Sequence, residues 1–144
     1  VGDANDNCPG QGVITGDETA LIRAITLLTE AGARKVVRLP ITIAAHSPLM
    51  ASVADEFAAA VDAAPLATAR IPVVANVTAR PIAAPDEIRA ELKAQLTSPV
   101  RWTDSIRYLG AQGVDSYVEV GPGDVLLGLV KRIDRESRRV KFEL

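Results

Sequence analysis

The sequence predicts an α/β fold with a largely parallel sheet, because short apolar runs alternate with segments of helical periodicity along the chain. The composition is that of a folded globular domain: 48% of the 144 residues are hydrophobic and 24% are charged. Aromatic residues make up only 3%, so the core is expected to consist of Ala, Val, Ile and Leu side chains. This length corresponds to about one domain.

The first third of the chain predicts a β-α-β unit. The apolar run over 12–15 favours a strand, and Asp17 is placed as the N-cap of a helix over 19–31. Residues 35–43 are again rich in β-branched and apolar side chains, interrupted by Pro40, and predict the second strand of the unit.

The middle of the chain predicts two helices on either side of a compact strand. Ser47 and Pro48 are the residue types of an N-cap and a first helical position, so a helix is expected from here to Pro65 at the latest. The run over 71–75 predicts a strand. A second helix is expected within 85–99, which has a proline at each end.

The last part of the chain predicts two more helices with a strand between them. Thr103 is placed as the cap of a short helix that Gly113 ends, and 117–120 favours a strand. Gly121-Pro122-Gly123 then leads into a helix from about Val125. A phosphate could sit at such a junction, but the lysine of a phosphate-binding loop is absent, so a structural turn is preferred.

Charge and hydropathy argue against several classes of protein. The chain carries 18 acidic and 16 basic residues, a net charge of −2, which disfavours nucleic-acid binding. The longest apolar run, over 125–130, is far shorter than a membrane span, so no membrane association is expected. No signal-like segment stands at the start, and a cytoplasmic location is expected. The first residues read as the middle of a chain, so we expect a fragment.

His46 is the candidate proton carrier, because it is the single histidine and lies between a predicted strand and a predicted helix. A histidine that only satisfies a loop is the simpler alternative. No serine lies in a Gly-x-Ser-x-Gly turn, so the chain offers a base without a convincing nucleophile. Cys8 is a possible thiol nucleophile, and a single Cys and a single His provide no metal site.

The stretch over 131–141 is basic. It holds six basic and two acidic residues, a local net charge of +4. Such a stretch suits an acidic protein partner or a phosphorylated ligand. A solvated helix face is the more common explanation.

Five segments, in order over almost the whole chain, carry a resemblance: 5–16 (NDNCPGQGVITG), 39–50 (LPITIAAHSPLM), 72–78 (PVVANVT), 95–102 (QLTSPVRW) and 119–123 (EVGPG). They resemble the signature stretches of the malonyl-CoA:acyl-carrier-protein transacylase family. The first is similar to its N-x-N-x-P-x-Q-x-V-I-x-G stretch and the second to its catalytic-histidine loop. Together they correspond to roughly the C-terminal half of such an enzyme.

The resemblance implies transfer of a malonyl group from coenzyme A to the phosphopantetheine thiol of acyl carrier protein, through an acyl-serine intermediate. By the match of its loop, His46 is the general base, and Gln95 is the residue whose backbone carbonyl holds the histidine. Asn76 is expected to support the same loop beside the substrate, and Asn7 and Gln11 to lie along the substrate cleft. The coenzyme A thioester is a substrate, so no cofactor is expected.

The resemblance also implies a division of the chain. Residues 1–42 correspond to the closing β-α-β half of a small ferredoxin-like subdomain, and residues 43–144 to the C-terminal part of a larger α/β-hydrolase-like core. The family's serine, oxyanion-hole glutamine and malonyl-binding arginine lie in the N-terminal half. That half is therefore an expected partner, and the chain alone is expected to be inactive. The alternative is a non-catalytic interaction module that docks acyl carrier protein through the basic stretch.

Overall fold

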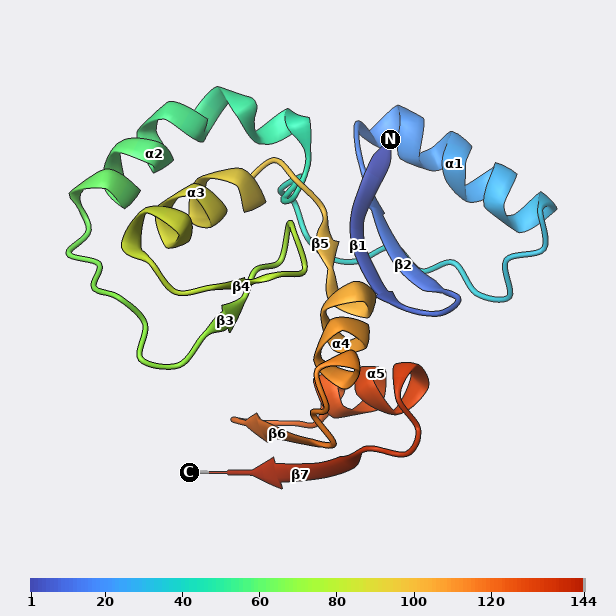
Figure 1. The fold of residues 1–144 in the computed structure, drawn as a ribbon. Coiled ribbons are helices and arrows are strands. Elements are labelled where there is room, and N and C mark those ends of the chain that lie inside the picture. The colour runs from blue at the N-terminus through green and yellow to red at the C-terminus, as the bar shows by residue number, and fades with distance from the viewer. Residues whose placement is uncertain (144) are drawn as a thin grey trace.

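The computed structural model describes residues 1–143 and has the mixed α/β character that the sequence predicts. Its strands form three small sheets, of three, two and two strands, instead of the expected single, largely parallel sheet. Figure 1 shows three groups of elements: a long hairpin with the first helix, two helices with a short hairpin on the opposite side, and the C-terminal helices and strands below.

The chain begins with a hairpin of β1 (Gly2–Cys8) and β2 (Gln11–Thr15), which pair antiparallel. The turn between the two strands contains Gly10, whose φ of 77° glycine tolerates without strain. On its other side β1 pairs in parallel with β5 (Val100–Arg101). This pairing joins the start of the chain to its last third, across the boundary expected near residue 42.

Helix α1 (Glu18–Glu30) follows as predicted, and the Asp17 carboxylate caps it by accepting from Thr19 N at 2.9 Å. The strand predicted over 35–43 is wrong, because this segment has no regular secondary structure. Pro40 removes one backbone donor, and among residues 1–143 no strand pairs with it. The predicted β-α-β unit is therefore a hairpin followed by a helix and an extended segment.

The second group contains the 3₁₀ helix η1 (Pro48–Val53), α2 (Ala54–Ala63) and α3 (Pro85–Gln95). Ser47 caps η1 as predicted, since its Oγ accepts from Leu49 N at 3.2 Å. Between the helices, β3 (Val73–Val74) and β4 (Pro81–Ile82) form a short antiparallel pair. The strand predicted over 71–75 is thus present but shorter, and the helix predicted within 85–99 is confirmed.

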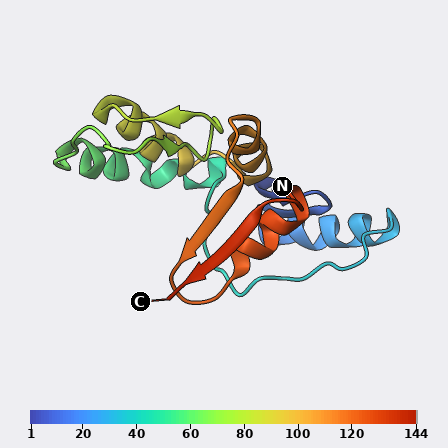
Figure 2. The same cartoon turned by 60° about the horizontal axis from the view of Figure 1, so that its bottom comes forward.

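The C-terminal group contains α4 (Trp102–Ala111), β6 (Ser116–Val120), α5 (Val125–Ile133) and β7 (Arg138–Phe142). Strands β6 and β7 pair in parallel with α5 between them in the chain, so the β-α-β unit of this structure lies here. Figure 2 shows the two strands side by side. The predicted cap of α4 is wrong: Thr103 lies within the helix, and its hydroxyl bonds to β1.

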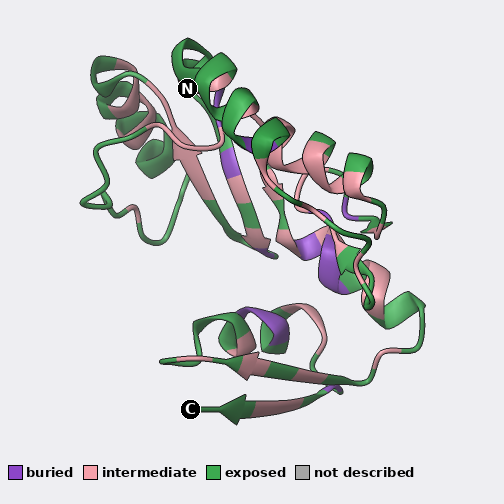
Figure 3. Cartoon of the chain, turned by 90° about the vertical axis from the view of Figure 1, so that its left-hand side faces the viewer, coloured by how far each residue is buried: buried purple, intermediate pink, exposed green. Residues whose placement is uncertain are grey.

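Few segments of the chain are buried (Figure 3), and the buried hydrophobic side chains are mainly small. The buried hydrophobic residues are Ala4, Cys8, Val61, Ala75, Ala79, Ile106, Leu129 and Val130. Large apolar side chains remain exposed along the chain, Ile71 and Val125 most of all. Among residues 1–143, every helix falls short of the length and apolar character that a bilayer-spanning helix needs.

Candidate active site

His46 lies in the loop before η1 and has a left-handed backbone, with φ of 61°. This conformation is uncommon for a residue with a side chain and costs about 1–2 kcal/mol. Two hydrogen bonds hold the loop: His46 N donates to Leu96 O at 3.1 Å, and the Ser47 hydroxyl donates to Ala44 O at 2.8 Å. The backbone is therefore fixed on both sides of the strained residue.

The imidazole of His46 is held by one ring nitrogen. Nδ1 lies 2.7 Å from the backbone carbonyl oxygen of Gln95. Because a carbonyl can only accept, Nδ1 carries the proton of the neutral ring and Nε2 has the free lone pair. Nε2 has no hydrogen-bond partner among residues 1–143. It is not fully buried, so solvent reaches it. The ring has the tautomer that a general base needs.

Gln95 is the last residue of α3, where the backbone carbonyls have no partner within the helix. His46 satisfies two of these carbonyls, those of Gln95 and Leu96. The side chain of Gln95 has a separate partner, since Asn76 Nδ2 donates to its Oε1 at 2.9 Å. The structure thus brings three of the predicted site residues into one network.

The other two predicted residues, Asn7 and Gln11, lie outside this network on β1 and β2. The Oε1 of Gln11 accepts from the guanidinium of Arg132 on α5 and, at 3.8 Å, from the Cys8 thiol. Arg132 also donates to Pro9 O at 3.1 Å, so it fixes the turn of the hairpin. Among residues 1–143 neither Asn7 nor Gln11 is hydrogen-bonded to His46.

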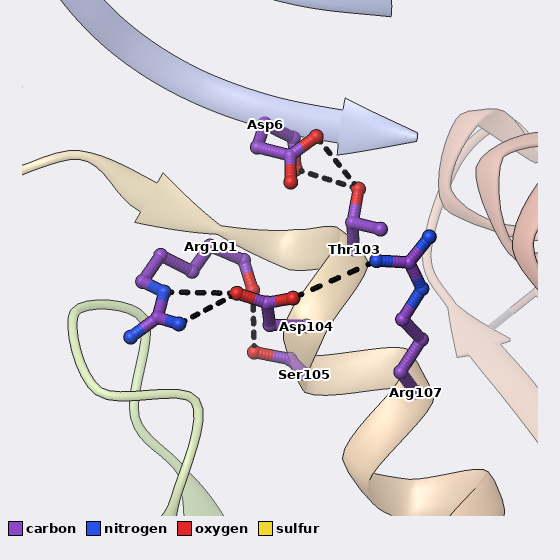
Figure 4. Close-up of polar contacts among 6 residues, drawn as sticks. All are labelled: Asp6, Arg101, Thr103, Asp104, Ser105 and Arg107. Atoms are coloured by element: carbon purple, nitrogen blue, oxygen red, sulfur yellow. Dashed lines mark hydrogen bonds and ion pairs between the residues drawn. The ribbon is translucent and has the colours of Figure 1, made fainter. Parts of the chain in front are cut away.

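Strand β1 is also tied to the N-terminus of α4. Figure 4 shows the Thr103 hydroxyl beside Asp6, where it donates to Oδ1 at 2.8 Å. Arg101 and Asp104 form an ion pair at 2.7 Å, and the Ser105 hydroxyl donates to Arg101 O at 2.9 Å. Sequence reasoning missed the contact between Asp6 and Thr103, because no local pattern marks a pair so far apart in the chain.

Cys8 is the fully buried residue of the hairpin, with 1% of its surface exposed. A thiol must be reached by its substrate to act as a nucleophile. The structure therefore disfavours Cys8 as the nucleophile of a thiol-dependent enzyme.

The basic stretch runs from α5 through a loop into β7, so the solvated helix face is a wrong description of most of it. Half of its basic side chains have structural partners: Arg132 holds the hairpin, Arg139 donates to backbone carbonyls, including Ser137 O at 2.6 Å, and Lys141 pairs with Glu143. The other three, Lys131, Arg135 and Arg138, are exposed.

A cavity of about 170 Å³ lies between α4, α5 and β6, and Asn76 is among its lining residues. Trp102 also lines it, and its indole Nε1 is buried without a hydrogen-bond partner among residues 1–143. A buried donor normally has a partner. Among residues 1–143, the Trp102 N–H is therefore an unpaired buried donor, and it lies at a cavity that Asn76 also lines.

Comparison with known proteins decides the family. The family model for the acyl transferase domain matches residues 1–141 of the sequence. The chain belongs to the acyl transferase domain family. Among curated relatives of this chain, the malonyl CoA-acyl carrier protein transacylase of Escherichia coli (strain K12) is 42% identical over 133 residues, which cover 92% of the chain and 43% of the relative.

Solved structures of the family superimpose closely on this chain. The transacylase of Xanthomonas oryzae is 42% identical with a TM-score of 0.92, over 96% of this chain and 44% of that one. A malonyl-transacylase in complex with a type II PKS acyl-carrier protein is 35% identical with a TM-score of 0.91, over 99% and 45%. The chain thus spans less than half the length of these relatives.

Proposed function

We propose that the chain supplies the general base for transfer of a malonyl group from coenzyme A to acyl carrier protein. The observation that carries this proposal is the pairing of His46 Nδ1 with Gln95 O at 2.7 Å, which leaves Nε2 free to accept a proton. The family supports the reaction class, and the names of the relatives give the malonyl substrate and the carrier protein.

In the first half-reaction, Nε2 of His46 takes the proton of a serine hydroxyl as the serine oxygen attacks the thioester carbonyl. The tetrahedral intermediate expels the coenzyme A thiolate, which takes the proton back from Nε2. The products are the malonyl-serine ester and free coenzyme A.

In the second half-reaction, Nε2 takes the proton of the phosphopantetheine thiol. The thiolate attacks the ester carbonyl, and the departing serine oxygen takes the proton from Nε2. Throughout, the carbonyl of Gln95 holds Nδ1–H and stabilises the imidazolium that forms at each step, as the carboxylate does in a Ser-His-Asp triad.

The serine of this mechanism comes from outside the chain, since no Gly-x-Ser-x-Gly turn is present. We propose that the serine is provided by the part of the domain that corresponds to the rest of the relatives' length. The same part would provide the groups that bind the malonyl carboxylate. Asn7 and Gln11 are proposed to border the substrate cleft on β1 and β2. The proposed boundary between a ferredoxin-like and an α/β-hydrolase-like subdomain lies near residue 42.

The exposed apolar face of the β6–β7 sheet supports the proposal that another part of the domain packs against this chain. Val118 pairs with Val140 and Val120 with Phe142, so these four side chains share one face. On the other face Glu119 bonds to α5. Val118, Val120 and Phe142 are 59%, 63% and 51% exposed. An apolar face of this kind is usually covered by another part of the protein.

A chimera tests the proposal: in the Escherichia coli relative, the matched 133 residues are replaced by the corresponding residues of this chain. We expect it to transfer malonyl groups from malonyl-CoA to acyl carrier protein, whereas the chain alone does not. The substitution His46→Ala should reduce kcat by roughly 10²- to 10⁴-fold. Ser52→Ala is the matched control, since Ser52 is exposed on the helix that follows His46.

Two results would overturn the proposal. One is a folded chimera that transfers no malonyl group. The other is a His46→Ala chimera with undiminished kcat. A chimera that binds acyl carrier protein without acyl transfer would instead favour the interaction module, and its binding should then depend on the exposed Lys131, Arg135 and Arg138.

A further inference from the structure

Gln95 uses two different groups to hold two different residues. Its backbone carbonyl accepts from His46 Nδ1 at 2.7 Å, and its side-chain Oε1 accepts from Asn76 Nδ2 at 2.9 Å. The resemblance accounts for the first contact. The second contact places Asn76 behind Gln95, where the Asn76 amide reaches His46 only through Gln95.

Asn76 itself is tightly fixed in the turn between β3 and β4. Its backbone carbonyl accepts from Arg101 N at 2.8 Å, which ties the turn to β5. The next residue, Val77, donates its N–H to Glu91 Oε1 at 3.1 Å, which ties the turn to α3. The turn closes with Ala79 N donating to Ala75 O at 2.9 Å, and both alanines are buried. The Asn76 amide therefore projects from a rigid support.

The last turn of α3 needs such a support. Gln95 ends the helix, and terminal turns fray because their carbonyls lack partners within the helix. If the Gln95 carbonyl moves, Nδ1 of His46 loses its acceptor. The alternative tautomer, with the proton on Nε2, is then no longer disfavoured, and its Nε2 cannot accept a proton from a nucleophile.

We propose that Asn76 is a positioning residue: it holds the Gln95 side chain so that the Gln95 carbonyl keeps the His46 imidazole in the reactive tautomer and orientation. Asn76 does not touch the reacting atoms. This inference rests on the proposed function, and it specifies how Asn76 supports the loop of His46.

A double-mutant cycle in the chimera tests the path through Gln95. Gln95→Met removes the side-chain acceptor but keeps the backbone carbonyl, and Asn76→Ala removes the donor. Each is expected to lower kcat about tenfold with KM little changed, because misorientation of the base acts on the chemical step. The double variant should be no slower than either single variant. Thr78→Ala, an exposed position in the same turn, should leave kcat unchanged.

Selective ¹⁵N labelling of histidine gives a readout that does not depend on activity. The His46 ring signals, assigned by their loss in His46→Gln, should show Nδ1–H in the parent chimera and a mixture of tautomers in Asn76→Ala and in Gln95→Met. The proposal is overturned if the tautomer is unchanged, if Asn76→Ala raises KM at constant kcat, or if the two effects on kcat multiply. Failure of acyl transfer in the parent chimera would overturn the proposed function, while the tautomer would still decide the role of Asn76.

Discussion

The Thr103 hydroxyl donates a 2.8 Å hydrogen bond to Oδ1 of Asp6 and so joins the first strand of the chain to a helix 97 residues later. Thr103 is buried, with 2% of its surface exposed, whereas Asp6 is exposed. The bond lies where Asp6 pairs with Arg101, at the end of the parallel β1–β5 pairing. It therefore fixes the start of α4 against the sheet.

Replacing Thr103 by Val removes this bond and keeps the shape of the side chain. We expect the free energy of unfolding to fall by about 1.5 kcal/mol, because a hydrogen bond to a charged group is lost while the carboxylate stays solvated. Urea unfolding followed by circular dichroism measures the change. Thr103→Ser, which keeps the hydroxyl, should cost less, and a Val variant as stable as the parent would contradict the contribution of this bond.

The strained backbone of His46 predicts a difference between two substitutions at that position. His46→Gly and His46→Ala both remove the imidazole, but only Gly adopts a φ of 61° without strain. The Gly variant should therefore be the more stable by about 1 kcal/mol, while both lose acyl transfer in the chimera. Thermal unfolding compares them. Equal stability, or a more stable Ala variant, would show that the loop relaxes once the ring is gone.

Local signals in the sequence mark the starts of two helices. The carboxylate of Asp17 and the Ser47-Pro48 pair mark helix starts through contacts within three residues, so their meaning is independent of the rest of the fold. His46 is conspicuous as the single histidine, immediately before the helix start at Ser47. Its partner Gln95 is 49 residues away and makes the contact through its backbone, so only the family resemblance pointed to it.

Strand pairing was the part that the sequence did not reveal. The residues of β1 are mostly Gly, Asp and Asn, which disfavour strands, yet β1 forms because β2 and β5 pair with it on either side. Strand β7 contains three basic residues, and the sequence pattern indicates only a basic stretch there. The apolar segment over 35–43 has a strand-like composition, but among residues 1–143 no strand pairs with it.

Glu119 provides the cap that α5 otherwise lacks. The side chain of Asp124, at the N-cap position, makes no capping bond, and the Glu119 carboxylate accepts from Leu126 N at 3.2 Å and Leu127 N at 2.9 Å instead. Glu119→Ala should lower the free energy of unfolding by about 1–2 kcal/mol, since two helix N–H groups and the favourable interaction with the helix dipole are lost.

Glu119→Ala should also loosen the β1–β2 hairpin, because α5 carries Arg132, which donates to Gln11 and Pro9. Amide exchange near the hairpin turn is expected to become faster in Glu119→Ala. Glu136→Ala, an exposed acidic position outside α5, is the control. Identical exchange in the two variants would show that the hairpin is held independently of this cap.

Tyr117 predicts a loss of stability at alkaline pH. Burial raises the pKa of its phenol, and the negative charge of Asp134 raises the pKa further. Because the folded chain holds the phenolic proton more tightly than the unfolded chain, the stabilisation is complete below the ordinary tyrosine pKa of about 10 and is lost as the pH rises through the folded-state value. Tyr117→Phe should therefore flatten the dependence of stability on pH in this range.

Absorbance titration measures the phenol directly. In Tyr108→Phe, Tyr117 is the single tyrosine of the chain, so the phenolate signal reports on it alone. Its midpoint should lie above that of the same variant in urea. Asp134→Asn should lower the midpoint only in part, since burial is the larger cause. A folded-state midpoint equal to that in urea would mean that water reaches the phenol and that the contact of its hydroxyl with Ile106 O, at 3.4 Å, does not persist in solution.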